Sequence, residues 1–144
     1  MTRGDIYMLD FGIPFGSEPG RRRPVVIIQA DKENLNNLNT KVVVPLTSNT
    51  INADLRGNVF LPKNESGLSK DSVALIHQIV VVDKFRLEEK ISKLPKHLLS
   101  KIEDEIDYVT KVRSRHAVKP RAVQPVVLWT FRAGRKEDNQ KLFL

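Results

Sequence analysis

The 144-residue chain contains no cysteine, and this absence excludes several kinds of site. Without a thiol there is no disulfide, no thiolate nucleophile and no cysteine-ligated zinc. The three histidines, His77, His97 and His116, are too far apart in the sequence to form a local metal motif. The sequence also lacks the GxxxxGK(S/T) phosphate loop and the GxGxxG dinucleotide fingerprint. We therefore expect a function that needs no metal ion and no common cofactor.

Long apolar runs are also missing. No run approaches the roughly 18 residues that suggest a membrane span, and Met1–Asp5 does not have the layout of a secretory signal. We therefore expect a cytoplasmic chain with no membrane partner. Its 40% hydrophobic and 28% charged residues are typical of a globular protein, and its length suits a single hydrophobic core.

The formal net charge of +7 is unevenly distributed. Residues 1–112 carry 16 lysines and arginines against 15 acidic residues, whereas residues 113–144 carry 8 against 2. Bulk charge therefore gives no argument for nucleic-acid binding by the first 112 residues, where only a local arrangement of charges could do so. We interpret 1–112 as one domain and 113–144 as a basic C-terminal extension.

The first 94 residues are typical of short strands separated by turn-rich loops. The continuous apolar run at Val25–Ile28 predicts a strand that is buried on both faces. The longest strand is expected at Asp71–Val82, with His77 and Gln78 on opposite faces because strand side chains alternate. The expected strands are Ile6–Phe11, Val25–Ile28, Lys41–Leu46, Asn58–Leu61 and Asp71–Val82.

One helix is predicted after these strands. Pro95 suits a first helical position, and apolar residues recur at helical spacing from Leu98 to Val112. Strands in meander order followed by one helix favour a small, strongly bent sheet or a partly open barrel. In the extension, Pro125–Phe131 is compatible with an edge strand or with an apolar patch.

Polar residues gather at three places beside these apolar strands: Arg21–Pro24, Thr47–Ser48 and His77–Gln78. Each group has an ordinary structural explanation, as a solvated loop end, a turn or a hydrogen-bonded core residue. Together they would also suit RNA cleavage by the RNA's own 2′-hydroxyl. That reaction needs a proton acceptor, a proton donor to the leaving oxygen and cationic donors to the phosphorane, and an arginine fork matches phosphate oxygens.

An ordered set of motifs gives this interpretation its specificity. Arg3-Gly4-Asp5-Ile6-Tyr7, Gly16-Ser17-Glu18 and Arg23-Pro24-Val25 come first, and Val44-Pro45-Leu46-Thr47-Ser48 follows. Asp71-Ser72-Val73-Ala74-Leu75, Gln78-Ile79, Val82-Asp83-Lys84 and Arg86-Leu87 complete the set. In this order and spacing, residues 2–112 resemble the MazF/PemK toxins.

The resemblance implies a mainly β fold with a C-terminal helix, an SH3-like small barrel of the MazF/PemK/CcdB type, which forms a homodimer. It implies a metal-independent, sequence-specific endoribonuclease that cuts single-stranded RNA, leaves a 2′,3′-cyclic phosphate and a 5′-hydroxyl, and is blocked by a cognate antitoxin. By position, Arg23 and Thr47 are the predicted catalytic pair. The predicted RNA-binding residues are Phe15, Ser17, Glu18, Ser48, His77 and Gln78.

Two departures from the family pattern leave alternatives open. Where family members often have an acidic residue before the strand glutamine, this chain has His77, which is either a proton acceptor or a structural residue. Residues 113–144 extend beyond the usual end of the family's helix. Because one fold hosts several activities, a gyrase-inhibiting toxin or a non-catalytic module that binds RNA or antitoxin remains an alternative.

Overall fold

The computed structural model describes residues 1–13, 16, 20–36 and 38–111, and all of its helices and strands lie within Met1–Thr110. Pro125–Phe131 and the rest of the basic extension lie outside the described residues. In chain order the elements are β1 (Asp5–Asp10), β2 (Arg22–Ile27), α1 (Asp31–Asn34), β3 (Thr40–Thr47), β4 (Asn58–Leu61), α2 (Lys63–Ser66), β5 (Ser72–Leu75), the 3-10 turn η1 (Ile76–Gln78), β6 (Val80–Asp83), the 3-10 turn η2 (Lys84–Arg86), β7 (Leu87–Lys93) and α3 (Lys96–Val109).

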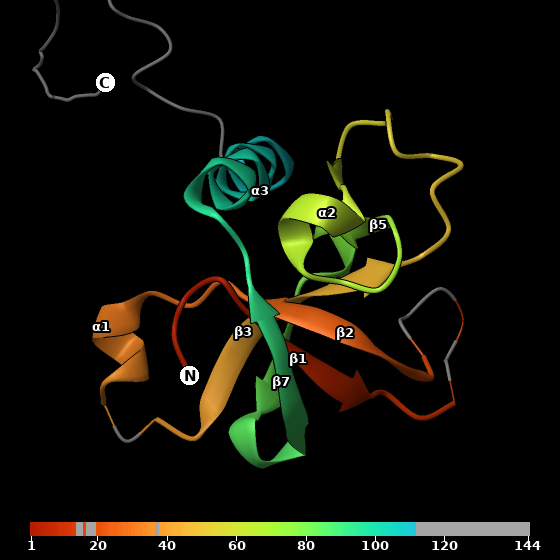
Figure 1. The fold of residues 1–144 in the computed structure, drawn as a ribbon. Coiled ribbons are helices and arrows are strands. Elements are labelled where there is room, and N and C mark those ends of the chain that lie inside the picture. The colour runs from red at the N-terminus through yellow and green to blue at the C-terminus, as the bar shows by residue number, and fades with distance from the viewer. Residues whose placement is uncertain (14–15, 17–19, 37, 112–144) are drawn as a thin grey trace, which may run out of the picture. The chain divides into compact units, whose positions relative to one another are not determined.

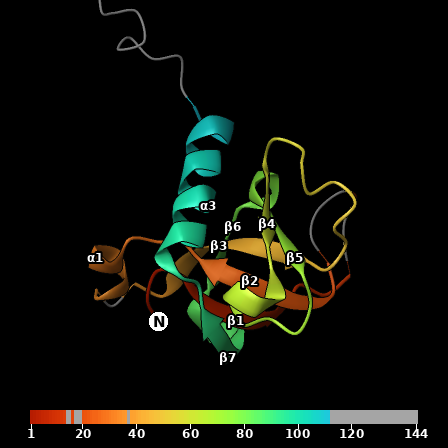
Figure 2. The ribbon, with the colours of Figure 1, turned by 45° about the horizontal axis from the view of Figure 1, so that its top comes forward.

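The strands form one antiparallel sheet in the order β4-β5-β3-β2-β1-β7, with β6 also paired to β3 (Figure 1). The helix α3 lies across one face of this sheet, beside β4 (Figure 2). This arrangement confirms the predicted fold class, a mainly β structure with a C-terminal helix. The helix begins one residue later than predicted, because Pro95 is its N-cap and not its first residue. None of the helices in the described part of the chain is long and apolar enough to cross a membrane.

The prediction of a single long strand at Asp71–Val82 was wrong. The segment is divided into β5 and β6 by η1, and both strands pair with β3. The register of pairing with β3 differs between β5 and β6: Leu46 pairs with Ala74 of β5, whereas Val43 pairs with Val80 of β6. Pro45 lies in β3 between these two pairings and has no N–H to donate to a ladder. The three residues of η1 therefore bulge out of the sheet at this point.

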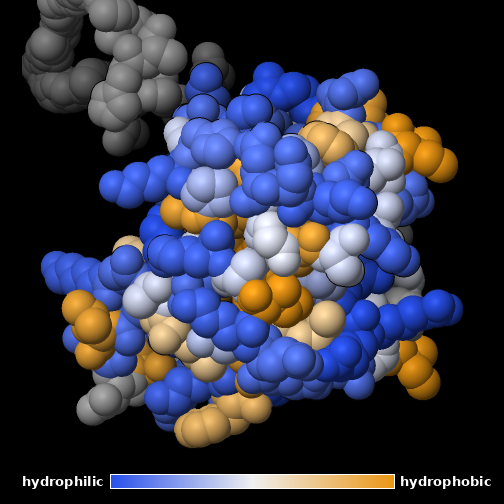
Figure 3. Space-filling model, in the orientation of Figure 1, coloured by the Kyte–Doolittle hydropathy of each residue, from blue (hydrophilic) through white to orange (hydrophobic). Residues whose placement is uncertain are grey.

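The core explains why β2 is apolar on both faces. Val26 and Ile28 join a cluster that includes Leu98 and Ile102 of α3. Val25 and Ile27 join a second cluster on the opposite face of the sheet. All four residues of Val25–Ile28, in β2 and directly after it, are buried, which confirms the prediction for this segment. On the face shown in Figure 3, hydrophobic atoms are confined to small separate patches among hydrophilic side chains.

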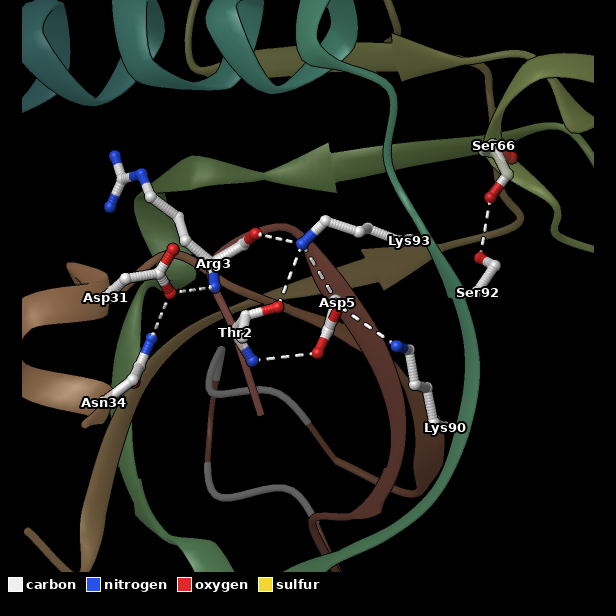
Figure 4. A network of polar contacts seen from close by, with 9 residues as sticks. All are labelled: Thr2, Arg3, Asp5, Asp31, Asn34, Ser66, Lys90, Ser92 and Lys93. Carbon is white, nitrogen blue, oxygen red and sulfur yellow. Dashed lines mark hydrogen bonds and ion pairs between the residues drawn. The ribbon is translucent and has the colours of Figure 1, made fainter. Parts of the chain in front are cut away.

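A strand that the sequence did not predict, β7, is anchored to β1 by charged side chains. The sequence of β7, Leu-Glu-Glu-Lys-Ile-Ser-Lys, is mostly exposed and lacks an apolar run. Lys90 and Lys93 each bring their Nζ to 3.4 Å from Oδ1 of the buried Asp5 (Figure 4). The other carboxylate oxygen of Asp5 accepts a hydrogen bond of 2.8 Å from the Thr2 backbone N–H. The N-terminal turn is thus fixed against β1 and the edge strand β7.

Candidate functional site

A hollow of about 320 Å³ lies where β1, β2 and the end of β3 meet the loop before β5. Two of the three predicted polar groups, Arg21–Pro24 and Thr47–Ser48, lie in its wall. The residues that line it are Met8, Arg21, Arg22, Arg23, Pro24, Leu46, Thr47, Ser48, Leu68, Ser69, Lys70 and Ser72.

Strand register brings the two predicted catalytic residues to the same end of the β2–β3 ladder. The last pair of this ladder is Val25 of β2 with Pro45 of β3. Arg23 lies two residues before Val25 and Thr47 two residues after Pro45, and both line the hollow. Beyond the last pair β3 continues only its pairing with β5, through Leu46 and Thr47. The divergence of the strands leaves the space that Arg23 and Thr47 line.

The turn before β2 sets the direction of Arg23. Arg21 has a φ of 65°, in the left-handed region, and its backbone N–H donates a 2.6 Å hydrogen bond to the Gly12 carbonyl. Arg23 Nε donates to the Gly20 carbonyl at 3.0 Å. This bond uses one of the five guanidinium N–H groups, so the fork that recognises phosphate oxygens keeps most of its donors.

Arg22 also lines the hollow, but carboxylates of β7 hold its guanidinium. Its Nε lies 2.8 Å from Glu88 and one terminal nitrogen lies 2.7 Å from Glu89, both on β7. The Glu88 hydrogen bond is the main cause that raises the pKa of Arg22 above its usual value. The two consecutive arginines thus differ in their partners: ion pairs tie Arg22 to β7, whereas Arg23 keeps most of its donors for the hollow.

Hydroxyl groups complete the wall opposite the arginines. The Thr47 Oγ1 accepts a 3.2 Å hydrogen bond from the Asn49 backbone N–H, which fixes the turn at the end of β3. Ser48 follows it and is exposed. Ser72 is 5% exposed and donates its hydroxyl to the Lys70 carbonyl at 3.0 Å. Ser69 and Lys70 lie in the loop between α2 and β5.

The charges around the hollow have one sign. Arg21, Arg22, Arg23 and Lys70 line it, and none of its lining residues is acidic. This concentration is local, because residues 1–112 are almost neutral overall. Cations beside hydroxyl donors, with no carboxylate among them, favour a phosphate or another anion as the occupant.

His77 and Gln78 lie elsewhere, in η1, and neither is among the residues that line the hollow. His77 is exposed and Gln78 is half-buried. The His77 ring packs against Gly57, where a Cβ would approach within 2.1 Å of it. Glu105 of α3 accepts a 2.8 Å hydrogen bond from the Gly57 N–H, which is the main cause that lowers the pKa of Glu105. His77 thus has structural neighbours in this chain, and its part in RNA binding stays a prediction.

Three predicted RNA-binding residues, Phe15, Ser17 and Glu18, lie outside the described residues. Conversely, the hollow includes residues that sequence reasoning did not single out, such as Met8, Ser69 and Lys70. Ser72 lies in a family-like motif, which was a usable signal. Within the described part of the chain, no three His, Asp or Glu side chains are grouped so as to hold a metal ion.

Comparison with known proteins identifies the family. Residues 2–110 match the family described as the PemK-like, MazF-like toxin of type II toxin–antitoxin systems. The chain is 39% identical over 103 residues to endoribonuclease MazF6 of Mycobacterium tuberculosis, covering 72% of this chain and 90% of that protein. The chain belongs to the PemK-like, MazF-like toxin family.

Solved structures agree with this assignment at the level of the fold. The crystal structure of MazF from Deinococcus radiodurans has a TM-score of 0.64 at 21% identity and covers 76% of this chain and 94% of its own. An endoribonuclease in complex with its cognate antitoxin, from a mycobacterial species, has a TM-score of 0.58 at 19% identity and covers 75% and 90%. Both carry the fold that places Arg23 and Thr47 beside the hollow in this toxin-family chain.

Proposed function

We propose that this chain is an endoribonuclease toxin that cleaves single-stranded RNA at the hollow between Arg23 and Thr47. The observation that carries the proposal is the lining of that hollow, in which Arg21, Arg23 and Lys70 meet hydroxyl groups and no lining residue is acidic. Family membership supports the same activity, because the mycobacterial relative is an endoribonuclease. Such a lining suits a phosphodiester whose negative charge increases during the reaction.

The reaction we propose uses the RNA's own 2′-hydroxyl as the nucleophile. Its oxygen bonds to the adjacent phosphorus while the bond from phosphorus to the 5′-oxygen breaks. The 2′-hydroxyl loses its proton to a base, and the departing 5′-oxygen gains one from an acid. The products are a 2′,3′-cyclic phosphate and a 5′-hydroxyl, and no oxidant or cofactor is consumed. The requirement for a 2′-hydroxyl restricts the substrate to RNA.

Within this reaction we assign Arg23 the main electrostatic role. Its guanidinium binds the non-bridging oxygens of the phosphorane and protonates the 5′-oxygen, whereas Thr47 donates its hydroxyl to a phosphate oxygen. A guanidinium enters the reaction protonated, so it can donate a proton but cannot accept one, and we leave the base unassigned. Ser48 contacts the RNA beside Thr47. The same contact role is proposed for Phe15, Ser17, Glu18, His77 and Gln78.

The partners follow from the same family. We propose that the toxin acts as a homodimer in the cytoplasm and that a cognate antitoxin blocks its RNA site. The mycobacterial endoribonuclease structure that contains a cognate antitoxin supports this arrangement. The positive hollow also favours a partner with acidic residues, because complementary charge accelerates association.

The test is incubation of the purified chain with a long single-stranded RNA in the presence of EDTA. We expect discrete fragments with 5′-hydroxyl ends, because every group used in the reaction belongs to the RNA or to the chain. Arg23→Ala and Thr47→Ala should each lower the cleavage rate by about 100-fold or more, the size typical of removing one donor to a developing oxyanion. Lys63→Ala, an exposed change on α2, is the matched control.

Three results would contradict the proposal. RNA left intact by a folded chain would favour the non-catalytic module, and inhibition of DNA supercoiling by gyrase would favour the gyrase-inhibiting alternative. Equal activity of wild type and Arg23→Ala would mean that the cleavage arises from another site or from a contaminant.

A further inference from the structure

A second hollow, of about 350 Å³, lies at the opposite end of β3 from Thr47. It is lined by Met1, Asn34, Lys41, Lys84 and Phe85, which come from the N-terminus, α1, the start of β3 and η2. As in the first hollow, the charged residues in its lining are all basic. None of the proposed catalytic residues takes part in it.

Lys41 is the unusual member of this hollow, because it is a lysine with only 3% of its surface exposed. Its Nζ donates a 2.9 Å hydrogen bond to the Asn34 side-chain oxygen, which also accepts from Gln29 at 3.1 Å. No carboxylate of the described residues forms an ion pair with Lys41. An ammonium has three donors, and a buried charge is costly unless it is compensated. Lys41 thus contributes a buried positive charge to the wall of the hollow.

Two neighbouring side chains add a second cation and a flat apolar surface. The Lys84 Nζ lies 5.3 Å from the centroid of the Phe85 ring. Phe85 is 80% exposed although it is a large aromatic residue. The Asp83 carboxylate accepts the Phe85 backbone N–H at 2.9 Å and holds the turn that presents this ring. Asp83 is the acidic residue nearest to Lys84 and Phe85 in the sequence, and its carboxylate is thus bonded to the backbone of η2.

We propose that this second hollow is an accessory binding site for single-stranded RNA, in which Lys84 binds a phosphate, the buried charge of Lys41 stabilises it, and Phe85 stacks on a base. A positive groove next to an exposed aromatic ring is how proteins bind single strands without reading sequence. An acidic peptide would use the two lysines but would gain little from an isolated flat ring. The proposal rests on the proposed function, since it concerns RNA already engaged at the first hollow.

The length of β3 determines which RNA reaches both hollows. Six residues separate Lys41 from Thr47, which corresponds to about 20 Å along an extended strand. A short oligonucleotide centred on Arg23 and Thr47 extends only half its length towards Phe85 and does not reach it, whereas a longer one spans the distance. The accessory site should therefore strengthen the binding of long RNA and leave the binding of short RNA unchanged.

The experiment measures the affinity of the full chain for uncleavable 2′-O-methyl RNAs of about 4 and about 16 nucleotides, a range typical of single-strand sites. Phe85→Ala should weaken binding of the longer RNA about fivefold or more through lost stacking. The logarithm of the RNA-binding constant falls linearly with the logarithm of the salt concentration. Lys84→Gln should make this slope shallower by about 0.7, the value for one phosphate contact on a single strand. Phe60→Ala and Lys63→Gln change matched exposed residues on other elements and should have neither effect.

Other outcomes overturn the proposal in distinguishable ways. If wild type cleaves RNA and both variants keep its ratio of long to short affinity, the accessory site is wrong and the proposed function stands. If both variants lose affinity only for a polyglutamate peptide, the hollow is a protein-binding site. A changed oligomeric state of Phe85→Ala would make the ring an interface between copies. If wild type neither binds nor cleaves RNA, the proposed function fails too.

Discussion

At the scale of single residues, the account depends on the different surroundings of two adjacent arginines. Arg22 is paired with Glu88 and Glu89, whereas Arg23 makes one hydrogen bond to a backbone carbonyl beside the hollow. We expect Arg23→Gln to lower the RNA cleavage rate by about 100-fold or more, as removal of a transition-state donor does. Arg22→Gln should cost much less activity, because its guanidinium is already occupied. Initial rates of RNA cleavage by the two variants and by wild type measure this difference. Equal loss of rate in both variants would contradict the different roles of Arg22 and Arg23.

Asp5 carries a prediction about stability and pH. Burial raises the pKa of Asp5. The Thr2 N–H and the ammonium groups of Lys93 and Lys90 together lower it by more, so the net shift of the pKa is downward. Because this pKa is lowered, the Asp5 carboxylate contributes to the free energy of unfolding at neutral pH. This contribution is lost as the pH falls from about 4 through the folded-state pKa.

Asp5→Asn should therefore reduce the free energy of unfolding at pH 7 by about 1.5–3 kcal/mol, the range for hydrogen bonds to a charged group. The difference from wild type should shrink as the pH falls below about 4. Urea unfolding at several pH values measures it. Asp10→Asn, an exposed change on the same strand, is the control. A difference that stays constant down to acidic pH would contradict the role assigned to the Asp5 carboxylate.

At the scale of elements, α3 contributes to the fold mainly through one apolar face. Ile102 is fully buried and Leu98 is 2% exposed, and both belong to the core cluster under the helix. Ile102→Ala should lower the free energy of unfolding by about 2–5 kcal/mol, as removal of a buried isoleucine side chain does. Ser100→Ala, on the exposed side of α3, should change it by less than about 0.5 kcal/mol. Chemical denaturation measures the free energy of unfolding of both variants. If Ile102→Ala changes it as little as Ser100→Ala does, α3 packs loosely on the sheet.

The elements also show which parts of the fold the sequence encodes locally. Periodicity and continuous apolar runs predicted α3 and the buried β2, because burial on a helix stripe or on two sheet faces leaves a direct pattern. The interruption of the predicted strand at Ile76–Gln78 depends on Pro45 in a partner strand, and β7 depends on charge pairing with β1 and β2. Neither cause is visible within the segment that it shapes.

The same distinction applies to the first hollow. Arg23 and Thr47 were predicted from motifs, and the pairing of β2 with β3 brings them to the same end of the ladder, where both line the hollow. Lys70 lies in no motif, and only the path of the loop before β5 brings it to the same wall.

The second hollow gave no sequence signal, because a lysine in a β-strand is ordinarily exposed and nothing local shows that Lys41 is buried.

At the scale of the whole molecule, charge is divided between a nearly neutral toxin domain and a basic extension. Residues 113–144 carry a net charge of +6, and we propose that they add non-specific affinity for RNA phosphates. Removal of residues 113–144 should weaken RNA binding and flatten its salt dependence by about 0.7 per lost phosphate contact. The cleavage pattern should not change, because the proposed catalytic residues lie within residues 1–112. Unaltered affinity and salt response would mean that the extension has no part in binding.

The central claim is that this toxin-family chain cuts RNA through the 2′-hydroxyl next to the broken bond. The most direct measurement uses a short RNA that contains the mapped cleavage position, together with a copy that has a single 2′-deoxy nucleotide on the 5′ side of that bond. The account predicts that the all-RNA strand is cut in EDTA to a 2′,3′-cyclic phosphate and a 5′-hydroxyl, and that the copy is bound but stays intact. Cleavage of the 2′-deoxy copy at the same bond would contradict the account, because the nucleophile would then have to come from water or from the protein.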